Sequence, residues 1–132
     1  TMLLGEDLAE GNFHPLTVLD GVTHGMSIMT EETFGPVACV MRVSGDTEAV
    51  KMANDTRFGL AAAVFGESSH AEEVAAQLTA GMIGINKGCG GAKGSPWVGA
   101  QESGYGWHSG PTGHRQFCQV RTLSRAKPKP KA

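Results

Sequence analysis

The sequence predicts an α/β fold: part of an open parallel sheet built from βαβ units. Three short apolar runs bounded by turn residues, at 37–43, 60–65 and 82–86, alternate with two helical segments. Strands that alternate with helices over short links form right-handed crossovers and a parallel sheet. Glycine is abundant, with 19 residues among 132, so we expect much of the remaining chain to be loops.

The N-terminal part is expected to supply an extended segment and a short turn. Residues 12–20 (NFHPLTVLD) are predicted to be extended, and residues 26–30 to form one helical turn. Residues 31–36 are interpreted as a loop. The run that follows at 37–43 (VACVMRV) is nearly all apolar, which is typical of a strand buried on both faces.

Two helices are predicted between the buried strands. An N-cap signal at 44–47 (SGDT) precedes a helix at 47–54. Ser69, with Glu72 three residues on, has the spacing of a capping box and predicts the start of the second helix. Gly81 is the expected stop signal of that helix.

The C-terminal part combines an alternating apolar and polar pattern with an excess of basic residues. Residues 117–124 (FCQVRTLS) alternate, which predicts a last strand at an edge or exchanged with another chain. All 13 acids lie at or before Glu102, and six of the 11 Lys and Arg residues lie from Arg115 onward. The Lys/Pro segment from Lys127 has no interleaved aromatic residues, so the basic charge fits a sheet edge better than a nucleic-acid site. The Lys/Pro segment from Lys127 is expected to be disordered.

Cysteine and histidine usage points to a reducing compartment without a metal. Cys39, Cys89 and Cys118 are widely spaced, an odd count that fits no disulfide framework. The histidines show no i, i+4 pairing, so we expect no metal site. No apolar run approaches a membrane span, and the N-terminus lacks a signal-peptide pattern, so a cytoplasmic protein with no membrane partner is expected.

The segment 31–37 (EETFGPV) is the densest candidate for chemistry. A carboxylate here could accept hydrogen bonds from sugar hydroxyls while Phe34 packs against a flat ring. The alternative is a polar turn with one core aromatic. The residues alone leave both interpretations open.

Three further segments have a structural and a functional interpretation. Asn54 and Gly59 are most simply turn residues. Asn86 is expected to brace the Gly-rich loop that follows it. Residues 95–108 are rich in glycine and aromatics, as pocket walls often are, or they form a connector whose tryptophans fill gaps.

Cys89 lies in a loop that is expected to face solvent. A nucleophilic thiol needs a base nearby, and the sequence does not place His108 or His114 beside it. A hydrolase that uses Cys89 is therefore a weak alternative. Cys39 and Cys118 are predicted to be inert core residues on strands.

Four motifs together resemble the aldehyde dehydrogenase superfamily. They are EETFGPV, ANDTRFGLAAAVF, AGMIGIN and SPWVGAQESGYG, at 31–37, 53–65, 80–86 and 95–106. They occur in the family's order and at its spacings, and the resemblance covers residues 10–124. The last motif departs from the family's more usual PFGGxKxSG.

The resemblance implies NAD or NADP as cofactor and an aldehyde as substrate. The same resemblance implies that Glu32 binds the ribose hydroxyls beside the nicotinamide and that Phe34 packs against the nicotinamide ring. The loop at 87–95, with Cys89 and Gly91, and Trp97 are expected to line the substrate entrance.

The resemblance also implies how the chain is organised. Residues 1–116 are expected to be the C-terminal portion of the catalytic domain, 117–125 the oligomerisation strand of a homo-oligomer (dimer or tetramer), and 126–132 a disordered tail. No residue matches the family's nucleophilic cysteine, general-base glutamate or oxyanion asparagine, so we expect this fragment to be inactive alone. The alternative is a non-catalytic interaction module of the same fold.

Overall fold

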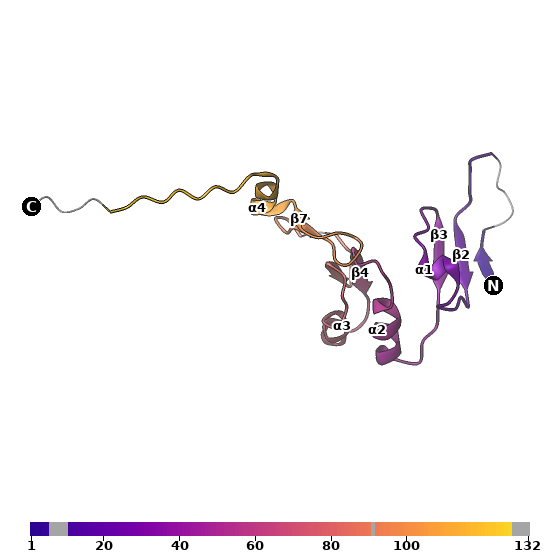
Figure 1. Ribbon diagram of the computed structural model, residues 1–132. Coiled ribbons are helices and arrows are strands. Elements are labelled where there is room, and N and C mark those ends of the chain that lie inside the picture. Colours follow the sequence, from indigo (N-terminus) through magenta and orange to yellow (C-terminus); the bar gives the residue numbers. More distant parts are fainter. Residues whose placement is uncertain (6–10, 91, 128–132) are drawn as a thin grey trace, which may run out of the picture.

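The computed structural model of the protein describes residues 1–5, 11–90 and 92–127. In this part of the chain, helices and strands follow one another along an extended path that ends in a long irregular segment (Figure 1). The predicted α/β class, with parallel strand pairs, is confirmed.

The first sheet has the order β1-β2-β3. β1 (Met2–Leu4) pairs antiparallel with β2 (Thr17–Asp20), and β2 pairs parallel with β3 (Val37–Val40). The short helix α1 (Ser27–Thr30) lies in the connection that makes the parallel pairing possible. The extended segment and the helical turn expected in this region are therefore confirmed, and β2 is a sheet member that the sequence did not single out.

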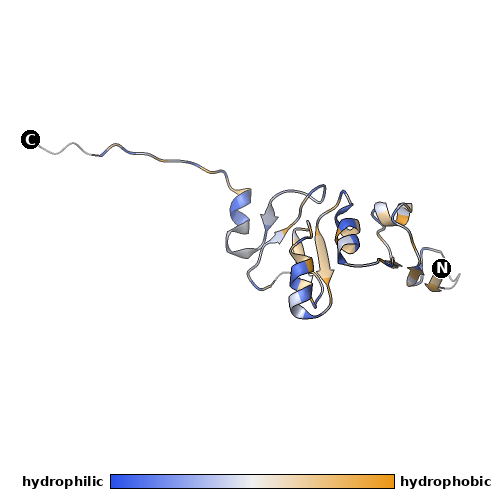
Figure 2. Ribbon diagram, turned by 90° about the horizontal axis from the view of Figure 1, so that it is seen from below, coloured by the Kyte–Doolittle hydropathy of each residue, from blue (hydrophilic) through white to orange (hydrophobic). Residues whose placement is uncertain are grey.

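The second sheet is a βαβ unit. α2 (Asp46–Asn54) leads into β4 (Ala61–Val64), and α3 (Ser68–Ala75) connects β4 to its parallel partner β5 (Met82–Ile85). Ala71, one helical turn before Ala75, is fully buried where α3 contacts both strands. In Figure 2 the paired strands are drawn in orange and the helix beside them is largely blue, so the unit is amphipathic.

Two sequence predictions are wrong: the strands do not form a single sheet, and β3 and β4 are not buried on both faces. β3 pairs with β2 and β4 with β5, and within the described residues no pairing joins β3 to β4. Along β3 and β4, half-buried residues also alternate with exposed ones. The physical reason is that no described element packs over the second face of these strands. An apolar run shows that a strand can be buried, but it does not show which element packs over it.

The third part of the structure is a small hairpin followed by helical turns. β6 (Trp97–Val98) pairs antiparallel with β7 (Trp107–His108). α4 (Gly110–Gly113) and a 3₁₀ turn, η1 (His114–Phe117), follow directly. This hairpin positions the aromatic residues of the candidate pocket.

Residues 118–127 form neither helix nor strand, so the strand predicted at 117–124 does not form within this chain. Phe117 is 81% exposed, Val120 89% and Leu123 83%. A strand needs a neighbour for its backbone ladder, and no described strand lies beside this segment. The expected core location of Cys118 is wrong for the same reason, because the residue is exposed. The tail predicted to be disordered lies outside the described residues from position 128 onward.

The start and end of α3 differ from the sequence prediction. Glu67, not Ser69, is the N-cap residue, and the helix ends at Ala75, well before Gly81. The Glu67 carboxylate accepts hydrogen bonds from the Ser69 hydroxyl (2.6 Å) and the His70 N–H (3.1 Å). These bonds, the first above all, hold the pKa of Glu67 below its ordinary value.

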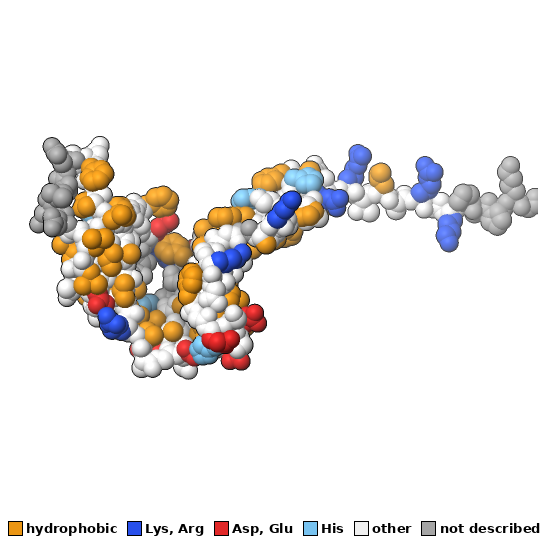
Figure 3. Space-filling view, turned by 180° about the vertical axis from the view of Figure 1, so that it is seen from behind, with side chains coloured by type: hydrophobic (Ala, Val, Ile, Leu, Met, Phe, Trp, Pro, Cys, Tyr) orange, Lys and Arg blue, Asp and Glu red, His pale blue; other side chains and the backbone are white. Residues whose placement is uncertain are grey.

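The described chain buries few apolar side chains. Those buried are Val22, Ala71, Ala75 and Met82. Many larger ones lie on the surface, and Figure 3 shows them gathered over the first sheet and along the arm that leads to the C-terminus. In residues 1–5, 11–90 and 92–127, no helix has the length and apolar character needed to cross a bilayer.

Candidate functional site

The segment that carries Glu32 and Phe34 links α1 to β3 and contains no helix or strand, as predicted. It begins at Glu31, the C-cap of α1, whose N–H donates to Ser27 O at 2.8 Å. Two short-range backbone bonds shape the turn, from Gly35 N to Thr33 O (3.1 Å) and from Val37 N to Gly35 O (2.9 Å). The segment is thus defined locally but is not packed into a core.

Both candidate side chains of this segment are exposed. Phe34 is 98% exposed, so its interpretation as a core aromatic is wrong for the described chain. Glu32 is also exposed, and its carboxylate has no hydrogen bond or ion pair among the described residues. An uncovered ring beside an unpaired carboxylate is an arrangement that a ligand with a flat ring and hydroxyl groups could occupy.

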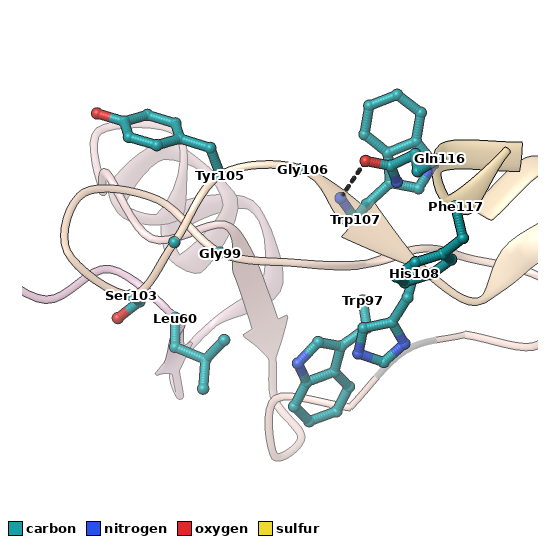
Figure 4. Close-up of a pocket in the computed structure, with 11 residues that line it drawn as sticks. Leu60, Trp97, Gly99, Ser103, Tyr105, Gly106, Trp107, His108, Gln116 and Phe117 are labelled. Atoms are coloured by element: carbon teal, nitrogen blue, oxygen red, sulfur yellow. Dashed lines mark hydrogen bonds between the residues drawn. The ribbon is translucent and has the colours of Figure 1, made fainter. Parts of the chain in front are cut away.

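The hairpin β6–β7 encloses a cavity of 420 Å³ together with the loop at 99–106 and η1 (Figure 4). The rings of Trp97 and His108 stack on one side, with centroids 6.2 Å apart and planes inclined by 18°. The Trp107 N–H donates to the Gln116 side-chain oxygen at 3.2 Å, which ties β7 to η1. Tyr105 points away from this stack in Figure 4 and is 94% exposed.

The predicted substrate-entrance loop and Trp97 lie close together. Trp97, with Ser95, Ser109 and Gly110, also lines a second cavity of 270 Å³. A third cavity, of 310 Å³, lies between the loop residues around Lys87 and the start of β5. All three cavities are lined by residues of the 87–110 region.

Two predicted entrance residues do not add to this picture. Cys89 is an exposed free thiol and lines none of the cavities above. The ring of His108 lies 3.0 Å from the Ser109 hydroxyl, and no hydrogen bond joins it to Cys89 in the described part of the chain. Gly91 lies outside the described residues.

The two candidate groups are not brought together. Glu32 and Phe34 precede β3 in the first sheet, whereas Trp97 lies in the hairpin beyond the second sheet (Figure 1). None of the cavities described above is lined by residues from both groups. The described residues therefore present two partial surfaces and no closed site.

Asn54 and Gly59 have the structural roles that the sequence favours. Asn54 donates to Gln77 O (2.8 Å) and accepts from the Thr79 N–H (3.0 Å) and hydroxyl (3.2 Å), so it joins the end of α2 to the segment before β5. Gly59 is buried, and a Cβ there would lie 2.9 Å from Ala100 O. The glycine is needed for this close approach rather than for an unusual backbone angle.

Asn86 braces a different loop from the one expected. Its side-chain oxygen accepts the N–H of Gly66 at 2.9 Å, in the turn after β4. Asn86 has φ 53°, a left-handed conformation that asparagine tolerates better than most residues. It therefore fixes the β4–α3 turn, not the Gly-rich loop that follows it.

Sequence reasoning missed a cluster of charges centred on Arg57. The Arg57 Nη2 lies 2.9 Å from Glu31 Oε2, and its Nε lies 3.8 Å from Glu102 Oε2. No local pattern could have found these contacts, because the partners lie far apart in the sequence. The described residues include no group of three or more His, Cys, Asp or Glu side chains placed to hold a metal ion.

Comparison with known proteins decides the family. The model of the aldehyde dehydrogenase family matches residues 1–123. The chain belongs to this family.

Individual aldehyde dehydrogenases agree with that assignment. The chain is 40% identical, over 115 residues, to an aldehyde dehydrogenase of Paenarthrobacter nicotinovorans, covering 86% of the chain and 25% of that enzyme. It is 36% identical over 124 residues to the succinate semialdehyde dehydrogenase [NAD(P)+] of Escherichia coli K12, covering 92% of the chain and 27% of that enzyme.

A solved aldehyde dehydrogenase structure agrees as well. Betaine aldehyde dehydrogenase from Staphylococcus aureus in complex with NAD+ superposes with a TM-score of 0.80 at 32% identity, over 89% of this chain and 25% of that one. The chain thus spans about a quarter of the length of the relatives it matches. The resemblance stated from four motifs is confirmed.

Proposed function

We propose that this chain is the C-terminal part of an NAD(P)-dependent aldehyde dehydrogenase that oxidises an aldehyde to a carboxylic acid. The observation that carries the proposal is the family match over residues 1–123. Matched relatives include an NAD(P)+-dependent semialdehyde dehydrogenase and a betaine aldehyde dehydrogenase bound to NAD+. The cytoplasmic location remains a prediction from cysteine usage.

Glu32 and Phe34 form the cofactor-binding part of this proposal. The unpaired carboxylate of Glu32 suits the ribose hydroxyls, which are donors, and the exposed ring of Phe34 suits the face of a nicotinamide. When bound, the cofactor would supply the hydride acceptor for the oxidation. The contribution of these two side chains is to bind and orient the cofactor at that step.

Trp97, Cys89 and Gly91 form the substrate side of the proposal. Trp97 is supported by its place between two cavities, and its ring is held by the stack with His108. Aromatic walls of this kind exclude water and orient a substrate without chemical participation. Cys89 and Gly91 remain predictions from the resemblance.

The chain is proposed to be inactive by itself because it supplies no activated nucleophile. Cys89 and Cys118 are exposed, and Cys39 is half-buried on β3. The Cys118 Sγ approaches only the backbone oxygen of His114, at 3.8 Å, among the described residues. A catalytic thiol needs a neighbouring base to activate it as a nucleophile.

The alternative is a non-catalytic interaction module of the same fold. Its support is the extended segment after η1, whose Val120 and Leu123 are exposed, as is Phe117 at the end of η1, and which could pair with a second copy as a strand. In the leading proposal the same segment serves the homo-oligomer, a dimer or a tetramer, of the longer enzyme.

The test compares the 132-residue chain with the complete polypeptide that its reading frame encodes. We expect aldehyde-dependent formation of reduced nicotinamide by the complete polypeptide and none by the chain. Activity of the purified chain would overturn the assignment of the nucleophile to another part of the protein. Inactivity of both, with a stable oligomer, would favour the interaction module.

Substitution of the cofactor-binding pair tests the roles of its residues. We expect Glu32→Gln to raise the cofactor KM about tenfold or more, because a hydrogen bond to a charged group contributes about 1.5–3 kcal/mol. Phe34→Ala removes an aromatic contact of about 0.5–1.5 kcal/mol and should raise the KM about two- to tenfold. Glu72→Gln, at another exposed acid, is the matched control and should leave KM unchanged. An unchanged KM in Glu32→Gln would exclude Glu32 from the cofactor site.

A further inference from the structure

Arg57 lies in the turn between α2 and β4 and contacts three side chains. Its guanidinium Nη2 lies 2.9 Å from Glu31 Oε2 and its Nε lies 3.8 Å from Glu102 Oε2. Its Cζ lies 4.8 Å from the centroid of the Phe58 ring, which limits the rotamers available to the side chain. A guanidinium has five donors, so it can hold two carboxylates at once.

The two carboxylates belong to different parts of the molecule. Glu31 is the C-cap of α1 and directly precedes Glu32. Glu102 lies in the loop at 99–106 that lines the 420 Å³ cavity, and its N–H donates to Arg57 O at 3.0 Å. Arg57 is thus fixed to that loop through its backbone and reaches the first sheet through its side chain.

The segment that carries Glu32 and Phe34 has few other anchors. Among the described residues, the only side-chain hydrogen bond made by residues 31–36 is the one between Glu31 and Arg57. One parallel contact, His24 Nε2 to Asp55 Oδ2 at 2.9 Å, joins the same two regions. The orientation of the segment relative to the hairpin therefore depends on these two side-chain contacts.

We propose that Arg57 is a positioning residue, which sets the orientation of the Glu32–Phe34 segment at the cofactor by holding Glu31 against the loop that carries Glu102. This inference rests on the proposed cofactor role of Glu32 and Phe34. The ion pairs are half exposed, with 50% of the Arg57 side chain and 65% of the Glu31 side chain accessible, so their contribution to stability is small. Their main effect is on geometry.

The test uses Arg57→Gln, Arg57→Lys and Glu31→Gln in the complete polypeptide, each assayed in two ways. Hydrogen–deuterium exchange without cofactor should be faster in residues 31–36 of Arg57→Gln and Glu31→Gln. The cofactor KM should rise about two- to fivefold, as expected for partly exposed ion pairs, with kcat nearly unchanged. The double variant should be no worse than either single variant, and Arg57→Lys should recover part of the loss.

Arg42→Gln is the matched control. Arg42 is an exposed arginine whose partner, Asp20, lies 3.2 Å away within the same sheet, so its loss should change neither readout. Unchanged hydrogen–deuterium exchange in Arg57→Gln would overturn the proposal. So would faster exchange in Arg57→Gln with an unchanged cofactor KM, provided that Glu32→Gln raises the KM. If Glu32→Gln also leaves KM unchanged, the cofactor role itself fails, and the exchange readout alone decides whether Arg57 holds the segment.

Discussion

Gly81 lies where the chain entering β5 meets β6. Its N–H donates to Gly59 O at 2.9 Å, and a Cβ at this position would lie 2.8 Å from the carbonyl carbon of Val98. Gly81→Ala must therefore push the two backbones apart, at a cost of about 1–3 kcal/mol. We expect a Tm lower by several degrees for the complete polypeptide, measured by calorimetry.

Gly66 provides the control for this prediction. An added Cβ there meets nothing within 4 Å, and the residue does not have positive φ. Gly66→Ala should therefore melt within about a degree of the unsubstituted protein. Equal melting of the two variants would show that β5 and β6 do not approach closely at Gly81.

Single residues differ in how well the sequence predicts their roles. The sequence predicts a structural role for Asn54, but not its partners Gln77 and Thr79, which lie 23 and 25 residues further along the chain. Arg57 could not be predicted, because Glu31 lies 26 residues away and nothing local distinguishes this arginine from a solvated one. For Phe34 the sequence leaves an exposed and a buried position open, because a lone aromatic residue in a turn is compatible with both, and only the structure decides for exposure.

Secondary structure was predicted well where the signal is local. The apolar runs became β3, β4 and β5, and the helix expected at 47–54 became α2. The partition into two sheets could not be predicted, because pairing depends on which strands meet in space. The segment at 117–124 shows the same limit, since its alternation is compatible with a strand but supplies no partner.

The start of α3 makes a pH-dependent contribution to stability. Hydrogen bonds from the Ser69 hydroxyl, and then from the backbone of His70, lower the pKa of Glu67 in the folded state. Because the folded pKa lies below the unfolded one, the contribution is complete above the ordinary glutamate pKa of about 4.3. It is lost as the pH falls through the lower folded value.

Glu67→Gln should remove this pH dependence. We expect the variant to melt below the unsubstituted polypeptide at neutral pH and to approach its Tm as the medium is made acidic, as followed by circular dichroism. Glu73→Gln changes an exposed acid on the same helix for which the structure gives no side-chain hydrogen bond, so its Tm difference should not vary with pH. A constant difference for Glu67→Gln would contradict the capping role.

At the scale of the whole molecule, the exposed apolar surface is the dominant feature. Among the described residues, seventeen large apolar or aromatic side chains are exposed, whereas the four buried apolar side chains are Val22, Met82 and two alanines. One face of β3 also lacks a covering layer there. A surface of this kind is typical of a segment that folds against other protein. The chain spans about a quarter of its relatives' length. The residues that pack against this surface in a longer protein therefore cannot be predicted from this sequence.

The isolated chain should therefore unfold without a sharp transition. The four apolar side chains buried in the described part of the chain are too few to offset the entropy of ordering the backbone. We expect a broad thermal melt and binding of an apolar dye, whereas the complete polypeptide should melt cooperatively and bind little dye. A sharp melt whose midpoint rises with protein concentration would instead show that copies of the chain cover these faces for one another. That outcome would support the interaction module, because the residues exposed here would then be buried in a self-assembled oligomer.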